Sequence, residues 1–282
     1  MTRNSDFDRD SDRSLNRRNA LKALGTAGAA ITGTGVLGTV SAADPHRKYF
    51  AAQEAANEIR EKQGRQAMLR FLDKQGINYE TVRKPMVVER EGDDDVSTNE
   101  FDNVDGSFSD CDICLDFTLY TNSSSTIYTI DMEWTYDLEV GDYGQQPNDG
   151  AALYYTDSCW DYYFQSLSDT TYTSSYVTPE DDNNNDGVAF SVDDVSASDG
   201  DTLYCGLNIE PIGDCSYGQR EVFGQYLHNW TDVDVTSSFG VSFPAGISVS
   251  YSVDTEVNQE KTGTEGDGDT LMTLDQSEAT LD

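Results

Sequence analysis

The spacing of apolar residues changes once along the chain, from helical spacing to strict alternation. Between residues 46 and 76, apolar residues recur every three or four positions, first in an alanine-rich stretch and, after Gly64, in a second group that contains Met68 and Leu72. Gly76 is a natural helix stop. The pattern therefore predicts two short helices, followed by a strand over residues 79–89.

Beyond residue 104 the period becomes two. Apolar residues alternate with polar ones over 115–119 and again over 128–136, and the serine-rich run between them predicts a hairpin turn. Further strand candidates lie at 151–155, 162–167, 171–177, 188–192, 202–209, 222–228, 233–243 and 246–257. Short strands at regular intervals, separated by Gly, Asn and Asp, predict a mainly β protein, an antiparallel β-sandwich with a small N-terminal helical segment.

The same patterns divide the chain into five parts. Residues 1–43 read as a targeting segment, 44–91 as the helical segment with its strand, 92–103 as an acidic linker, and 104–259 as the sandwich domain. Residues 260–282 are rich in Gly, Asp, Glu and Thr and poor in apolar residues, so we expect a disordered acidic tail.

The N-terminus has the order of an export signal. A polar start leads to Arg17 and Arg18, then to an apolar run over 23–40 that contains five glycines, and then to the small residues 41–43. The arginine pair with the following Leu21 and Lys22 resembles the twin-arginine signal. The resemblance implies export of the folded chain, an extracellular location and no stable membrane anchor after cleavage; a retained anchor is the alternative.

Charge is distributed very unevenly. The formal net charge is −34, and residues 92–282 contain 40 acidic residues against two basic ones, Arg220 and Lys261. Such a surface repels itself in dilute salt and is screened in molar salt. This composition resembles exported proteins of extreme halophiles, of the haloarchaeal type. It also excludes nucleic acid and anionic lipid as partners of the acidic domain.

Residues 182–187 match the start of a calcium-binding loop. Oxygen donors stand at positions 1, 3 and 5, the turn glycine is at position 6, and position 12 is a carboxylate. The pattern predicts Ca²⁺ as a cofactor, and a plain turn is the alternative. The expected ligands are Asp182, Asn184, Asp186, the backbone carbonyl of Val188, and Asp193, with Asp194 as a substitute for Asp193.

Five cysteines in an exported chain predict disulfides. Cys205 and Cys215 flank a turn-like segment and are the first expected pair, which leaves Cys159 to bond with Cys111 or Cys114 and one thiol free. The alternative is a zinc site formed by four of these cysteines, Cys111, Cys114, Cys205 and Cys215.

Catalytic motifs are scarce. The chain has two histidines, His46 and His228, and neither a nucleophile-elbow nor a metalloprotease motif. The first hypothesis is therefore a non-enzymatic extracellular binding or surface-interaction domain, whose partner is a protein or carbohydrate at the cell exterior.

Two other hypotheses remain open. One is a secreted hydrolase that uses His228 or an acid pair concealed among many carboxylates, and the other is an exported protein with residues 44–91 as a pro-segment. An aromatic-rich stretch over 154–164 either fills the core or stacks on sugars.

Overall fold

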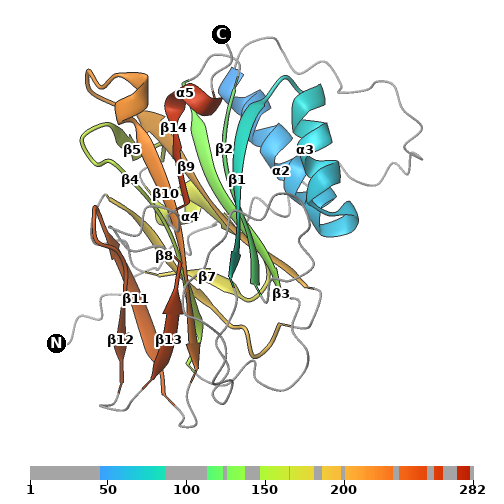
Figure 1. The fold of residues 1–282 in the computed structure, drawn as a ribbon. Coiled ribbons are helices and arrows are strands. Elements are labelled where there is room, and N and C mark those ends of the chain that lie inside the picture. Colours follow the sequence, from blue (N-terminus) through green and yellow to red (C-terminus); the bar gives the residue numbers. More distant parts are fainter. Residues whose placement is uncertain are drawn as a thin grey trace, which may run out of the picture. The chain divides into compact units, whose positions relative to one another are not determined.

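The computed structural model describes residues 45–86, 113–122, 126–136, 147–164, 166–180, 186–197, 201–230, 235–252, 257–262 and 272–279. The expected export signal at 1–43 and the expected acidic linker at 92–103 lie outside these ranges. Contacts group Asp44–Asp282 as one compact unit, and the description below concerns this unit (Figure 1).

Two helices follow one another near the start of this unit, as the spacing of apolar residues predicts. They are α2 (Pro45–Gln63) and α3 (Arg65–Lys74), and the chain turns between them at Gly64, whose φ of +78° suits glycine. No helix among the described residues is long and apolar enough to cross a bilayer.

The first sheet, sheet A, has six antiparallel strands. Its order is β1-β2-β3-β9-β5, and β6 also pairs with β9. The strands are β1 (Asn78–Met86), β2 (Ile113–Thr121), β3 (Tyr128–Tyr136), β5 (Trp160–Tyr162), β6 (Thr171–Thr173) and β9 (Thr202–Pro211). The predicted hairpin is confirmed, because β2 and β3 pair from Ile113–Tyr136 to Thr121–Tyr128.

The second sheet, sheet B, also has six strands, in the order β13-β10-β4-β8-β7, with β14 on β10. They are β4 (Asp149–Tyr155), β7 (Val177–Pro179), β8 (Gly187–Val192), β10 (Glu221–Trp230), β13 (Asn258–Lys261) and β14 (Met272–Asp275). A separate hairpin consists of β11 (Ser237–Ser242) and β12 (Gly246–Tyr251). Single-turn helices α4 (Leu167–Thr170) and α5 (Gln276–Ala279) and the 3₁₀ turn η1 (Tyr217–Gln219) complete the described elements.

The two sheets pack face to face, which confirms the expected mainly antiparallel β architecture with a small helical segment. Their facing sides share one apolar core, in which Phe117 and Trp134 of sheet A meet Leu153, Phe190 and Tyr226 of sheet B. These side chains are fully buried, and each contributes roughly 1.5–3 kcal/mol through removal of apolar surface from water.

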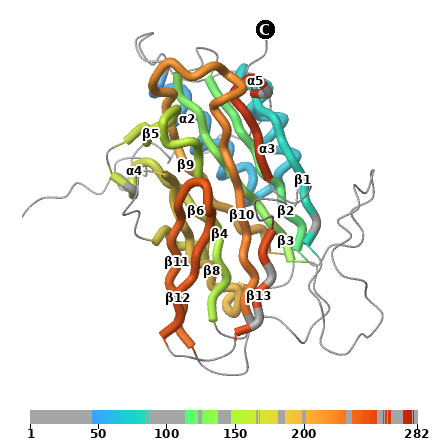
Figure 2. Tube along the Cα trace, turned by 60° about the vertical axis from the view of Figure 1, so that its left-hand side comes forward, coloured from blue at the N-terminus to red at the C-terminus, as the bar shows by residue number. Residues whose placement is uncertain are grey.

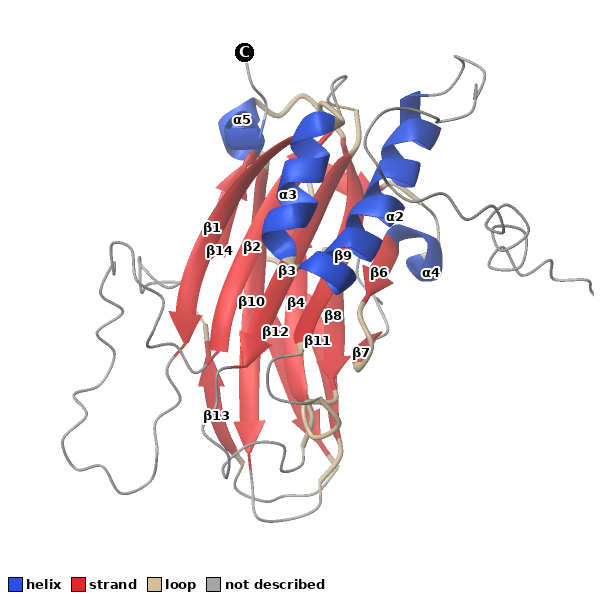
Figure 3. Ribbon diagram, turned by 90° about the vertical axis from the view of Figure 1, so that its right-hand side faces the viewer, coloured by secondary structure: helices blue, strands red, loops and turns tan. Residues whose placement is uncertain are grey.

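The outer faces of both sheets are also covered. Helices α2 and α3 lie across the outer face of sheet A (Figure 3), where Met68 and Leu72 pack with Tyr120. The β11–β12 hairpin lies beside β4 and β8 (Figure 2), where Phe239 and Ile247 join the outer side chains of sheet B in a third apolar cluster.

Two parts of the chain are arranged differently from the expected boundaries. Strand β1 pairs with β2 along its whole length, from Asn78–Thr121 to Met86–Ile113, so the described residues 45–86 lie in the same compact unit as the two sheets. The expected disordered tail, residues 260–282, contains the last residues of β13 and the whole of β14. Met272 and Leu274 of β14 are at most 1% exposed, because alternate side chains of this short strand enter the core.

Candidate functional sites

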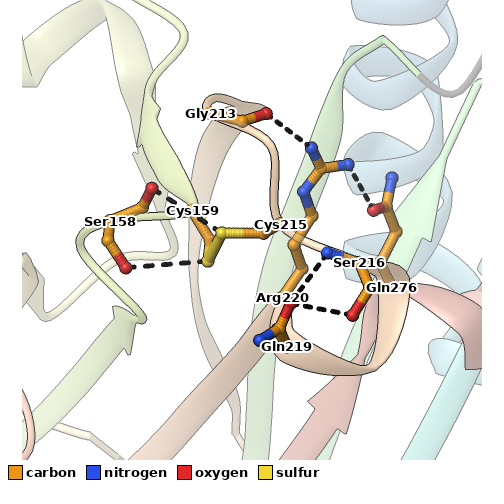
Figure 4. The surroundings of a disulfide bond; sticks show 8 residues. All are labelled: Ser158, Cys159, Gly213, Cys215, Ser216, Gln219, Arg220 and Gln276. Carbon is orange, nitrogen blue, oxygen red and sulfur yellow. Dashed lines mark hydrogen bonds between the residues drawn. A yellow bond between two sulfur atoms is a disulfide. The ribbon is translucent and has the colours of Figure 1, made fainter.

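The disulfide prediction is wrong. Cys215 pairs with Cys159 at a Cα–Cα distance of 5.7 Å (Figure 4). Cys205 is a buried free thiol. The segment between Cys205 and Cys215 is not a hairpin turn, because β9 in sheet A continues to Pro211 and the chain then crosses to β10 in sheet B.

The zinc alternative fails for the same reason. Cys114 and Cys215 are both disulfide-bonded, so neither offers a thiolate to a metal. Cys205 points into the core, where burial and the nearby Asp131 carboxylate raise the pKa of its thiol. A free cysteine of this kind acts as a small apolar side chain.

The structure describes only part of the predicted calcium loop. Asp182 and Asn184 lie outside the described residues. Strand β8 separates Asp186 from Asp193, and seven residues of extended chain span about 20 Å, far more than the diameter of one coordination sphere. The carboxylates of Asp186 and Asp193 also have separate partners, the backbone N–H of Phe243 and that of Ser196. Val188 lies on the core side of β8.

The aromatic-rich stretch over 154–164 is divided between two environments. Tyr154, Tyr155 and Trp160 are buried. Tyr163 and Phe164 are half-buried and pack against Phe50 of α2, with ring centroids 5.2 and 5.1 Å from it. Most of these rings therefore fill the interior, and two of them hold the helical segment.

A buried charged network joins α2 to the outer face of sheet A. Arg60 is fully buried and donates two hydrogen bonds to Asp131, at 2.9 and 3.0 Å, and one to Glu133 at 3.2 Å. Its guanidinium carbon lies 3.7 Å from the ring centroid of Tyr204. Burial opposes the charged form, but Asp131 and its neighbours raise the pKa of Arg60, while burial raises the pKa of Glu133.

Tyr172 adds a further donor to this network, because its hydroxyl donates to Asp131 at 2.6 Å. Gly206 of β9 leaves room for the Tyr172 ring beside Asp131, because a Cβ at residue 206 would overlap that ring. The network is therefore fixed from three directions, by α2, β6 and β9.

A cavity of about 310 Å³ lies beside this network, at the turn between α2 and α3. Two arginines line it. Arg83 of β1 donates to both oxygens of Asp116, and Arg65 of α3 donates to the hydroxyls of Thr81 and Thr118. Arg65 is 7% exposed, and its Nη1 is a buried donor with no hydrogen-bond partner within the described residues. Such a group is an attachment point for a ligand oxygen.

A second ionisable cluster lies inside the sandwich, at one end of sheet B. On the core side of this sheet the apolar alternation continues in each of three strands to a polar residue: Asp149 on β4, Asp194 just after β8, and His228 on β10. One ligand atom from each residue lies within 4.8 Å of the other two, and all three side chains are buried. His228 Nδ1 is 2.9 and 3.0 Å from the two Asp149 oxygens.

Hydrogen bonds hold Asp149 in a fixed orientation. The Tyr226 hydroxyl donates to one carboxylate oxygen at 2.6 Å, and the backbone N–H of Asn229 donates to the other at 2.8 Å. Tyr136 extends the chain through its hydroxyl, 2.7 Å from that of Tyr226. Burial and the Asp149 charge raise the pKa of Asp194 to about 9.

Sequence reasoning missed this cluster. It singled out His228 as the histidine that a catalytic site would have to use, and Asp194 only as a spare calcium ligand. The sequence does contain a signal for it. Asp149 and His228 each lie two residues from an apolar core residue of the same strand, and residues two apart share one face of a sheet, so both polar side chains are placed on the core face. The chain matches no protein-family model and no curated protein sequence.

Proposed function

We propose that this chain is an exported, non-enzymatic β-sandwich that binds a protein or carbohydrate outside the cell, in a high-salt environment. The twin-arginine resemblance and the acidic composition support the location. The observation that carries the binding function is the cavity at the α2–α3 turn with the buried, unsatisfied Nη1 of Arg65 beside it.

The chemistry of this cavity favours a small oxygen-bearing group as ligand. Its volume of about 310 Å³ is at the low end for ligand pockets, which suits one sugar unit or one side chain of a larger partner. A buried N–H without an acceptor costs roughly 1–3 kcal/mol, and a hydroxyl, carbonyl or carboxylate oxygen of the ligand would remove that cost. The Asp116 carboxylate, which also lines the cavity, can accept from a ligand hydroxyl or amide.

The test is binding of the fluorescently labelled full-length protein to intact cells and to their isolated surface polysaccharide in molar salt. Arg65→Met should abolish saturable binding, and Gln66→Trp, a change at an exposed residue that lines the cavity, should do so by filling it. Arg70→Met, on the exposed face of the same helix, is the matched control. Equal binding by all variants would refute the assignment of the cavity.

A secreted hydrolase is the second candidate, and the acid–histidine cluster favours it. Asp194 with a pKa near 9 stays protonated beside Asp149, which is the division of labour that acid–base hydrolysis needs. Turnover of a polysaccharide, ester or peptide in molar salt that is lost in Asp194→Asn would replace the first proposal with this one.

The pro-segment interpretation of residues 44–91 makes a different prediction. Cleavage near residue 91 would release a segment that Arg60 ties to sheet A through buried ion pairs and whose strand β1 pairs with β2. Intact-mass measurement of the secreted protein decides this point: a chain that begins near Asp44 and keeps the helices argues against a pro-segment.

A further inference from the structure

The acid–histidine cluster has two carboxylates and too few positive charges near them. Asp149 is 0% exposed, His228 2% and Asp194 9%. Within the described part of the chain, the donors to Asp149 are Tyr226, Asn229 and His228, and none is a lysine or arginine. Burying a carboxylate without a compensating charge is costly, so the cluster needs a cation or a proton.

The sequence makes an internal cation hard to supply. The two basic residues of the acidic block are engaged elsewhere: Arg220 donates to Gln276 and to the Gly213 carbonyl, and Lys261 donates to the Ile247 carbonyl. Neither of these two residues therefore supplies a positive charge to the Asp149–Asp194 pair.

Asp194 offers one carboxylate oxygen that could bind a metal ion. Asp194 is nine-tenths buried, and its Oδ1 has no hydrogen-bond partner among the residues that the structure describes. Asp149, in contrast, is oriented by hydrogen bonds to both oxygens, as carboxylates beside protein-bound metals commonly are. Asp149 is therefore held in a fixed orientation, while Asp194 Oδ1 can accept a cation.

We propose that Asp149, Asp194 and His228 bind one divalent transition-metal ion, with Zn²⁺ as the best fit. A divalent ion neutralises the two carboxylates. Imidazole nitrogen together with carboxylate oxygen suits Zn²⁺, whereas Ca²⁺ and Mg²⁺ take oxygen ligands almost exclusively. The three ligand atoms lie within 4.8 Å of one another, so small side-chain shifts bring each to the distance of about 2.0–2.2 Å that Zn²⁺ requires.

This site is separate from the cavity at the α2–α3 turn. It connects three strands of sheet B through side chains on the core face, while the cavity lies on the outer side of sheet A. Metal binding here and ligand binding there can each fail without affecting the other. The ion would act first as a cross-link between β4, β8 and β10.

The test uses the full-length protein, stripped with a strong chelator and then titrated with Zn²⁺ in molar NaCl containing excess Mg²⁺, which occupies the surface carboxylates. We expect one tightly bound Zn²⁺ per chain. Co²⁺ in place of Zn²⁺ should give the visible absorption of a site with nitrogen and oxygen ligands, and X-ray absorption should detect one imidazole.

Asp194→Asn should weaken Zn²⁺ binding at least tenfold, because it removes the negative charge of this ligand but keeps the side-chain shape. The control is Asp193→Asn, which removes the neighbouring carboxylate and leaves the cluster intact. Wild-type affinity in Asp194→Asn, or an equal loss in both variants, would overturn the proposal. So would the absence of stoichiometric Zn²⁺ on the wild-type protein, a result that does not depend on whether either variant folds.

Discussion

Replacement of Arg60 by methionine is the sharpest test of how the helical segment is attached. Methionine keeps much of the unbranched length but removes the charge, and leaves Asp131 and Glu133, which are 0% and 5% exposed, without their cation. Breaking a buried ion pair from one side costs about 3–5 kcal/mol, mostly because the remaining charge is uncompensated. The position of the guanidinium over Tyr204 adds a smaller loss.

The assay is equilibrium urea unfolding in molar salt, followed by tryptophan fluorescence, since Trp134 and Trp160 are both buried. Lys62→Met is the matched control on the same helix. Lys62 forms an exposed pair with Glu58 at 3.2 Å, so the expected loss is about 0.3–0.5 kcal/mol. The triple variant that also carries Asp131→Asn and Glu133→Gln should recover part of the Arg60→Met loss, because no buried charge remains unpaired.

A loss below about 1 kcal/mol in Arg60→Met, equal to that of the control, would refute this reasoning. It would mean that the carboxylates are neutral or hydrated and that the ion pairs contribute little to the attachment of α2.

Four further predictions concern the rest of the fold. Leu274→Ala should cost about 2–5 kcal/mol and Thr273→Ala less than about 0.5, measured by the same unfolding assay, because only Leu274 enters the core; equal effects would contradict the position of β14. Removal of the Cys159–Cys215 disulfide, which joins residues 56 apart, should lower stability by about 4 kcal/mol, and a loss under 1 would show that the loop is restrained by other contacts. Burial raises the pKa of Glu133, so its contribution to stability is full below the unfolded pKa of about 4.3 and is lost as pH rises through the folded value. Glu133→Gln cannot titrate, and its stability relative to wild type should rise with pH; a pH-independent difference would be inconsistent with the shift. Finally, the melting temperature should rise steeply from dilute to molar KCl, because screening reduces the self-repulsion of a chain with a net charge of −34, and no rise would remove the halophilic interpretation.

The sandwich itself was predictable because strands such as β2 alternate apolar and polar residues, as a sheet with one face in the core requires. Leu115, Phe117 and Leu119 alternate with polar residues, and all three are fully buried in the structure. The strand predictions were wrong for strands that are short or that pair with residues far away in the sequence. A strand was expected over 162–167, but β5 ends at Tyr162, and a turn and α4 follow. In β14 only two apolar residues mark a four-residue strand, too few for any periodicity to be visible.

The disulfide and the ionisable clusters depend on contacts between residues far apart in the chain. Cys159 and Cys215 meet only because β5 pairs with the last residues of β9, with Trp160 opposite Pro211. Proximity in sequence favoured Cys205, but β9 buries that side chain in the core between the sheets. Local spacing cannot predict such partners, because strand order decides them.

The two ionisable clusters differ in whether arginine side chains pair with their buried carboxylates, a difference that the composition of the chain does not show. On the outer face of sheet A, three carboxylates, Asp116, Asp131 and Glu133, meet three arginines, Arg60, Arg65 and Arg83, which all come from residues 44–91, where the charge is nearly balanced. Basic residues of the helical segment and of β1 are therefore the counterions of these three buried carboxylates. Asp149 and Asp194 lie on the opposite sheet, and the ionisable side chain grouped with them there is His228. Among the described residues, the fold supplies an arginine for each of these buried carboxylates on sheet A and none for Asp149 and Asp194 on sheet B, which leaves a place there for a cation from solution.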